Sequence, residues 1–175
     1  MDNDDDQAVL RRALDQLAGL LDDVPDDALG AWTPCDPWTV QDLVDHVVAT
    51  PTRFALMARG ESVDWSATPS AGPEPAARFR ENADDLLRTL GDAGAGGGVP
   101  VDWQCAELAV HTWDLATALG RSTADLDPEV AERGLSFMRA SLTDDNRSPA
   151  FGPEQPAPEA ADAYGRVAAF AGRSA

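Results

Sequence analysis

The sequence predicts an all-α protein, built as a helical bundle with additional short helices. Apolar residues recur at helical spacing in roughly five or six segments, and no segment of useful length alternates apolar and polar residues as a strand would. Residues 60–72 have neither pattern and are numerous enough to form a crossover loop. Long helices joined by one long crossover are typical of a helical bundle.

The chain of 175 residues is long enough to bury a substantial core, and we expect one domain over residues 1–175. No run of about 18 apolar residues is present, and the acidic N-terminus lacks the features of a signal peptide. We therefore expect a cytoplasmic protein with no membrane partner. Cys35 and Cys105 are too few for a disulfide framework and are expected to be reduced thiols.

The charge of the chain argues against one class of partner. The formal net charge is −18, and the sequence contains no lysine, so every basic side chain is an arginine. A phosphate backbone is bound by clustered lysines and arginines, so no nucleic-acid partner is expected. Most of the carboxylates are expected to form a solvated surface that aids solubility.

The first two helices are predicted from apolar stripes and from their end signals. One stripe predicts a first helix that ends near Asp22. A second helix begins after Thr39, an expected N-cap, with Asp42 at the third helical position and Trp38 where a hydrophobic staple would lie. Pro51 falls inside the pattern of the second helix, so a kink or a break is expected there.

The later helices are predicted by the same period and by their capping residues. In chain order they are Pro75 to Leu90, residues 101–119 with Gly120 after the end, a helix that begins at Asp127-Pro128 and includes Leu142, and residues 159–170 after a proline-rich loop. The glycine-rich segment 91–100 is expected to be a flexible connector. It is not expected to bind phosphate, because no strand precedes it and no Gly-Lys-Ser/Thr follows.

The fourth predicted helix places ionisable side chains together. Glu107 and His111 are four residues apart, so they lie on one helical face, about 5–6 Å apart at Cβ. An arc of about 80° holds Trp103, Glu107, His111, Asp114 and Ala118. If this stripe is buried, its ionisable groups are costly to desolvate unless they are paired, and a bound cation would remove that cost.

The other histidine, His46, lies in the second predicted helix, at the edge of its apolar face. His46, Glu107 and His111 together offer the ligand set of an open catalytic zinc site, and Mn or Fe suit the same atoms. Asp114 is expected either as a fourth ligand or as a partner for an imidazole N–H. Two interpretations without a metal stay open: a solvent-facing polar stripe, and a histidine satisfied by Glu107 alone.

The two cysteines are each isolated in the sequence. Cys105 lies about 160° around its predicted helix from Glu107, so it should not share the site. Cys35 precedes the second helix, near the expected cleft. Both are expected to be small buried residues rather than nucleophiles.

Two motifs carry a resemblance to a known family. The stretch Thr33-Pro-Cys-Asp-Pro-Trp-Thr-Val-Gln-Asp-Leu-Val-Asp-His46 resembles the N-terminal signature of the mycothiol-dependent maleylpyruvate isomerase family. Glu107-Leu-Ala-Val-His111-Thr-Trp-Asp-Leu-Ala resembles the second metal motif of that family. The closing segments Phe151-Gly-Pro and Ala171-Gly-Arg173 resemble an actinobacterial branch of small members. The similarity covers nearly the whole chain.

The resemblance implies a DinB-like four-helix bundle in which His46, Glu107 and His111 bind zinc or another divalent metal. It also implies a low-molecular-weight thiol, typically mycothiol, that the metal activates for isomerisation or S-transfer on a small electrophilic substrate. We expect no counterpart of the separate C-terminal domain of the full-length isomerase, so the resemblance does not assign maleylpyruvate isomerisation itself. The arginines available for thiol or substrate contacts are Arg53, Arg78 and Arg80.

Three functional hypotheses follow. The first is a metal-dependent enzyme in which the metal lowers the pKa of a thiol and presents a thiolate to an electrophile. The second is a non-catalytic metal- or ligand-binding helical-bundle module, and the third is a bundle without metal. The presence of all three ligand types favours the first. The identities of the thiol and the substrate stay open, as does the choice between a monomer and a homodimer.

Overall fold

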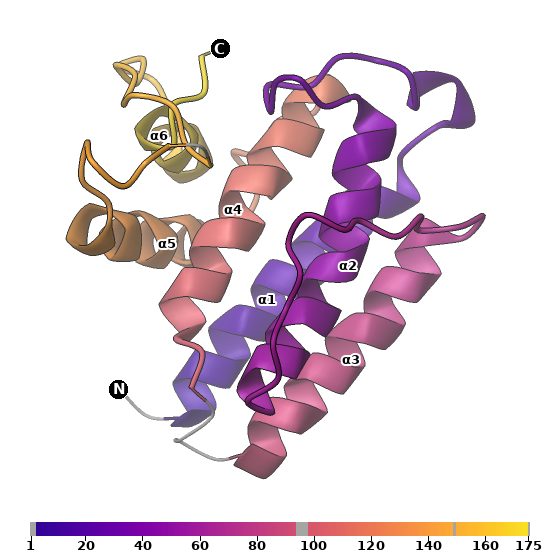
Figure 1. Ribbon diagram of the computed structural model, residues 1–175. Helices are drawn as coiled ribbons and strands as arrows, with labels where there is room; N and C mark the ends of the chain where they lie inside the picture. The colour runs from indigo at the N-terminus through magenta and orange to yellow at the C-terminus, as the bar shows by residue number, and fades with distance from the viewer. Residues whose placement is uncertain (1–2, 94–97, 149, 175) are drawn as a thin grey trace.

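The computed structural model describes residues 3–93, 98–148 and 150–174 (Figure 1). Within these ranges the elements are α1 (Asn3–Asp22), η1 (Asp26–Ala28), α2 (Val40–Ala58), α3 (Pro75–Ala93), α4 (Val101–Ala118), α5 (Pro128–Ser141) and α6 (Ala163–Phe170). The described residues form no strand, only an isolated β-bridge between Trp32 and Thr39. The predicted all-α fold is confirmed. None of the described helices is long and apolar enough to cross a membrane.

The four long helices α1 to α4 form a DinB-like bundle (Figure 1). Helices α1 and α4 run in one direction, and α2 and α3 run in the other. Because α2 and α3 are parallel, the chain must return along the bundle between them. Residues 59–74 make this return, as the predicted crossover requires. The core is filled by apolar side chains from all four helices, among them Leu10, Leu17, Leu43, Phe54, Leu86, Leu108 and Leu115.

Two predicted N-caps are confirmed. Thr39 caps α2 by accepting a hydrogen bond from the Asp42 backbone N–H, and the Asp42 carboxylate accepts one from the Thr39 N–H. This exchange is the capping box that the sequence predicts, and it satisfies two backbone donors at once. Asp127 caps α5, with Pro128 in the first turn.

Of the kink or break expected at Pro51, the structure excludes the break. Helix α2 continues through this residue to Ala58, and Pro51 itself is buried in the bundle. The proline removes one backbone hydrogen bond. The burial of the apolar residues on both sides of it compensates for that loss and keeps the helix continuous.

The structure also moves two helix ends. The last helix, α6, begins at Ala163 rather than at Glu159, because Asp162 accepts a hydrogen bond from the Gly165 N–H and so supplies the N-cap. Leu142 lies just after α5 rather than within it. The predicted connector 91–100 falls partly outside the described residues.

Helices α5 and α6 pack against α4, on the side of the bundle away from α3 (Figure 1). Because α4 also contacts α1 and α2, much of its surface is buried, including polar residues such as His111 and Asp114. Tyr164 of α6 fixes this arrangement. Its hydroxyl accepts a hydrogen bond from Gln16 of α1 at 2.7 Å and donates one to the Asp127 carbonyl at 3.3 Å.

Candidate metal centre

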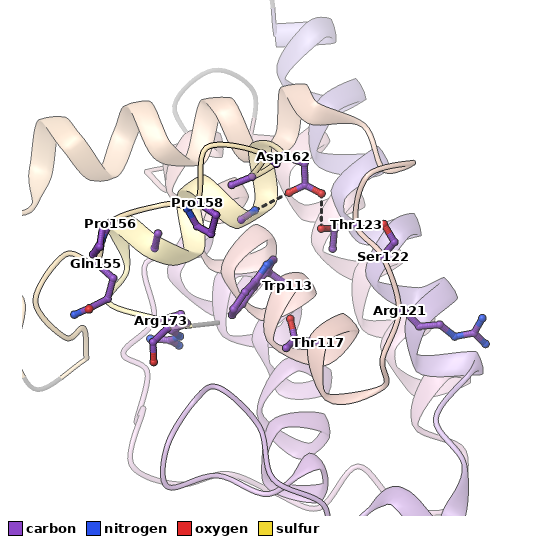
Figure 2. A pocket seen from close by; sticks show the side chains of 15 residues that line it. Trp113, Thr117, Arg121, Ser122, Thr123, Gln155, Pro156, Pro158, Asp162 and Arg173 are labelled. Atoms are coloured by element: carbon purple, nitrogen blue, oxygen red, sulfur yellow. Dashed lines mark hydrogen bonds between the residues drawn. The ribbon is translucent and has the colours of Figure 1, made fainter.

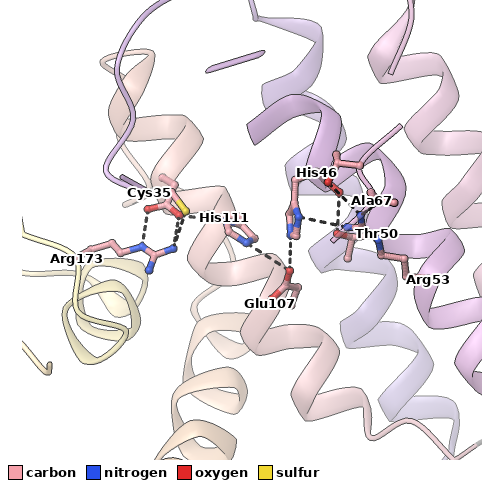
Figure 3. A network of polar contacts seen from close by, with 10 residues as sticks. Cys35, His46, Thr50, Arg53, Ala67, Glu107, His111 and Arg173 are labelled. Atoms are coloured by element: carbon pink, nitrogen blue, oxygen red, sulfur yellow. Dashed lines mark hydrogen bonds and ion pairs between the residues drawn. The ribbon is translucent and has the colours of Figure 1, made fainter. Parts of the chain in front are cut away.

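Helices α2 and α4 bring His46, Glu107 and His111 together. Nε2 of His46 lies 2.8 Å from Oε1 of Glu107, and Nε2 of His111 lies 3.4 Å from the same oxygen. The two imidazole centroids are 4.8 Å apart. Figure 3 shows the Glu107 carboxylate reaching both rings. One ligand atom from each of the three residues lies within 4.8 Å of the other two.

This donor set is chemically suited to a divalent cation. His46 and His111 are buried, and the Glu107 side chain is only 17% exposed. Two imidazole nitrogens and one carboxylate oxygen are the protein ligands of many open zinc sites. A carboxylate in such surroundings needs a positive partner, because an unpaired buried charge is strongly destabilising.

The three side chains also change one another's protonation. Burial alone would raise the pKa of Glu107, but His111 and His46 hold it well below its ordinary value. Burial disfavours the charged form of His111 as well, yet Glu107 and Asp114 raise its pKa to about 9. For His46, burial outweighs Glu107 and lowers the pKa. At neutral pH the described site therefore holds a Glu107–His111 ion pair beside a neutral His46.

Asp114 is fully buried and holds the other nitrogen of His111. Oδ2 of Asp114 lies 3.1 Å from Nδ1 of His111, whereas Nε2 of the same ring faces Glu107. Arg173 donates to both carboxylate oxygens of Asp114. Of the two expected roles for Asp114, this geometry favours that of partner for an imidazole N–H, a common arrangement around metal-binding histidines.

Of the two cysteines that the sequence predicts to be buried, Cys105 is buried and Cys35 is only half-buried. Cys35 is near the site: its Sγ accepts a hydrogen bond from Nη2 of Arg173 at 3.2 Å. Cys35, His111 and Asp114 form a second group with ligand atoms within 4.8 Å, but the Arg173 guanidinium already places a positive charge against two of its members. Cys105 is buried away from the site, and burial raises the pKa of both thiols to about 12.

Trp38 covers the two imidazoles, a position that the sequence did not predict. Its ring centroid lies 4.7 Å from that of His46 and 6.0 Å from that of His111. The sequence assigned Trp38 only to a staple before the N-cap. The position of Trp38 just before the N-cap could have predicted this contact, because a side chain there packs against the first turns of the helix, where His46 lies.

Of the three candidate arginines, Arg53 lies beside the site. Its Nη1 is 3.3 Å from Nδ1 of His46, and its Nη2 donates to the Ala67 carbonyl at 2.9 Å (Figure 3). Arg80 instead pairs with Asp22. Arg78 is exposed and, together with Arg53, lines a cavity of about 320 Å³ between α2, α3 and the crossover.

A larger cavity, of about 540 Å³, lies between the second half of α4 and the C-terminal segment (Figure 2). Arg173 is part of its lining, so one guanidinium contacts both Asp114 and the edge of this cavity. Other lining residues are Trp113, Thr117, Thr123, Gln155 and Asp162. The cavity therefore lies next to the polar network of the site.

Comparison with known proteins assigns the chain to a family. Residues 10–116 match the mycothiol maleylpyruvate isomerase N-terminal domain. Two uncharacterized proteins of Mycobacterium tuberculosis, from strains CDC 1551 / Oshkosh and ATCC 25618 / H37Rv, are each 33% identical over 182 residues, covering 94% of this chain and 95% of the relative. No solved structure matches the chain. The matched region includes α2 and most of α4, and the chain belongs to the mycothiol maleylpyruvate isomerase N-terminal domain family of DinB-like metal-binding domains.

Proposed function

We propose that the protein is a zinc-dependent enzyme that activates a low-molecular-weight thiol, such as mycothiol, for S-transfer to or isomerisation of a small electrophilic substrate. In this proposal residues 1–175 act as one domain, and His46, Glu107 and His111 bind the metal. The observation that carries it is the convergence of their ligand atoms within 4.8 Å in a buried site. When bound, zinc would lower the pKa of a coordinated thiol and so supply a thiolate.

Asp114 prepares His111 for this role. Its carboxylate holds the ring proton on Nδ1, which leaves Nε2 as the nitrogen that faces His46 and Glu107. A histidine that ligates a metal uses its deprotonated nitrogen, so the proton that Nε2 of His111 carries in the ion pair with Glu107 must leave when a metal binds. A hydrogen bond to the other nitrogen fixes both the tautomer and the ring orientation.

His46 has a different neighbour. In the described arrangement Arg53 donates to Nδ1, and the ring donates from Nε2 to Glu107. Metal binding through Nε2 requires that proton to leave this nitrogen. Arg53 stays anchored during the change, because its Nη2 also donates to the Ala67 carbonyl and the Thr68 hydroxyl.

Trp38 and the overall charge restrict what reaches the site. The indole packs against both imidazoles, which are 8% and 7% exposed, and low exposure to water strengthens the charge interactions there. The net charge of −18 repels a polyanionic cofactor such as a nucleotide. A largely neutral, sugar-linked thiol such as mycothiol meets a smaller penalty.

The first experiment measures the metal content of the purified protein. We expect about one zinc ion per chain, in line with an open site built from three protein ligands. His111→Ala should lose tight binding. Cys105→Ala should retain it, because Cys105 lies outside the site. Equal zinc content in the wild type and in His111→Ala would contradict the ligand assignment.

The second experiment tests the thiol. Calorimetric titration with mycothiol should show binding to zinc-loaded protein and much weaker binding to zinc-stripped protein. Identical weak binding to both forms would remove the thiol-activating function and would leave the non-catalytic metal-binding module as the better description.

A further inference from the structure

We infer that Arg173 is a positioning residue for the metal centre: its guanidinium fixes the Asp114 carboxylate, which in turn orients His111. The inference rests on the proposed role of His111 as a metal ligand. Arg173 lies in the C-terminal segment, beyond residues 10–116 that match the family. It therefore extends the site to a part of the chain that the family match does not cover.

The contacts form a continuous series. Nε of Arg173 donates to Oδ1 of Asp114, and Nη2 donates to Oδ2, each at 3.1 Å. Such a two-point contact fixes the plane of a carboxylate as well as its position. Oδ2 is also 3.1 Å from Nδ1 of His111. The orientation of the carboxylate thus determines the direction of the His111 hydrogen bond.

Because the contacts from Arg173 through Asp114 to His111 are buried, water cannot easily take the place of any one of them. Asp114 is 0% exposed, and the side chains of His111 and Arg173 are each 9% exposed. A lost contact in such a place is poorly compensated by water. Without the guanidinium, the Asp114 carboxylate would keep only His111 as a charged partner among these contacts. The Asp114–His111 hydrogen bond would then lose its fixed geometry.

The end of α6 is built to place Arg173 here. The N–H of Gly172 donates to the Ala169 carbonyl and the N–H of Arg173 to the Ala168 carbonyl, each at 3.0 Å, which is the pattern of a Schellman motif. Gly172 has φ of +90°, and a Cβ added to it would lie 2.6 Å from Cα of Gly152. Only glycine fits this turn. The turn brings the Arg173 side chain against α4 and Cys35 (Figure 3).

The test compares zinc affinity in two arginine variants by competition with a chelating dye. Arg173→Ala should bind zinc about 10–100-fold more weakly than the wild type, the usual effect of removing such a supporting partner. Arg166→Ala is the matched control: Arg166 is an exposed arginine of α6, the helix that precedes Arg173, and it donates to the Ala161 carbonyl. It should bind zinc like the wild type. Circular dichroism at the same temperature separates a loss of affinity from unfolding.

Restoring zinc affinity to Arg173→Ala with added guanidinium distinguishes the loss of this contact from a general loss of stability. The cavity of about 540 Å³ beside Arg173 offers a route for a small cation into Arg173→Ala (Figure 2). A few millimolar guanidinium should restore much of the zinc affinity of this variant and leave the wild type and Arg166→Ala unchanged. The visible spectrum of the cobalt-loaded protein should change in Arg173→Ala and return towards the wild type with guanidinium. Arg173→Lys keeps the charge without the two-point contact, so its affinity should be intermediate.

The outcomes separate this inference from the proposed function. If His111→Ala weakens zinc binding and a folded Arg173→Ala does not, the positioning role is wrong and the ligand assignment stands. If His111→Ala also leaves the affinity unchanged, the proposed function itself fails. If Arg173→Ala does not fold, Arg173→Lys decides: wild-type affinity together with a wild-type cobalt spectrum would overturn the inference.

Discussion

Gly134 of α5 lies against Ala106 of α4 so closely that a Cβ added to Gly134 would lie 2.7 Å from Cα of Ala106. The two helix backbones are in direct contact there, because glycine has no side chain to separate them. Ala106 directly precedes Glu107. Helix α5 therefore packs directly against the part of α4 that carries the site.

Gly134→Ala should destabilise the fold by about 1–3 kcal/mol, the usual cost of adding a methyl group where the structure has no room for it. The atoms in the way belong to the backbone of α4 and cannot rotate aside as a side chain could. Urea denaturation measures the change.

Gly19→Ala is the matched control for this prediction. Gly19 is an exposed position of α1. Among the described residues, no atom outside its own stretch of helix lies within 4 Å of a Cβ added to it. This substitution should stabilise the fold by about 0.5–1 kcal/mol, since alanine favours the helix. A gain in stability for Gly134→Ala equal to that for Gly19→Ala would show that the helices are not in contact at Gly134.

The sequence predicted those parts of the fold that depend on neighbouring residues. The starts of α2 and α5 were predictable because the caps Thr39 and Asp127 act within three residues of themselves. The start of α6 was not, because helix-compatible residues precede Asp162, and only the folded chain shows that Asp162 is the cap. The continuity of α2 through Pro51 depends on burial by other helices, which a local rule does not include.

The candidate site likewise has residues that the sequence predicted and one, Arg173, that only the folded structure shows. The four-residue spacing of Glu107 and His111 is local. His46 was predicted because it is the only other histidine of the sequence and lies in a predicted helix, and the resemblance to the family supported the same set. The structure then placed all three together, and their role as metal ligands stays a prediction. Arg173 had no local signal, because its partner Asp114 is 59 residues away and the contact exists only after α6 has packed against α4.

Thr39→Ala should lower the free energy of unfolding by about 1 kcal/mol, because it removes the N-cap of the helix that carries His46. The loss should appear as a lower midpoint of urea denaturation with an unchanged slope. Thr52→Ala, at an exposed position of the same helix, should change stability by less than about 0.5 kcal/mol. Equal effects of the two substitutions would contradict the capping role of Thr39.

The buried thiol of Cys105 should make the protein less stable in alkali. Its pKa is raised from an ordinary 9.0 to about 12 by burial, so between these values the unfolded chain loses the thiol proton and the folded chain keeps it. The free energy of unfolding therefore falls as the pH rises through 9, by about 1.4 kcal/mol from this group at pH 10.

The comparison of wild type with Cys105→Ala isolates this contribution. Thermal or urea denaturation between pH 8 and pH 10 should show a steeper loss of stability for the wild type than for the variant. Parallel pH dependences would show that Cys105 ionises equally in the folded and unfolded chains. The substitution itself changes the packing at all pH values, so the difference in slope is the relevant measurement.

Trp38 should report metal binding through its fluorescence. The indole lies 4.7 Å and 6.0 Å from the two imidazoles that we propose as ligands, so it is adjacent to any ion they hold. Cobalt(II) quenches nearby fluorophores, and its addition should quench the protein's emission until the site is filled. Of the five tryptophans, Trp38 should contribute the largest share of this quenching. Excess EDTA should restore the signal.

Trp38→Phe keeps an aromatic ring over the site but removes the indole, so it should bind cobalt and lose the largest share of the quenching that any one tryptophan contributes. Trp32→Phe is the control, because Trp32 is 61% exposed and its loss should leave the quenching intact. Since both variants still bind the ion, their difference depends only on where the ion lies relative to each ring. An equal loss of quenching in Trp38→Phe and in Trp32→Phe would show that the ion does not lie beside Trp38, and the ligand assignment would then be wrong.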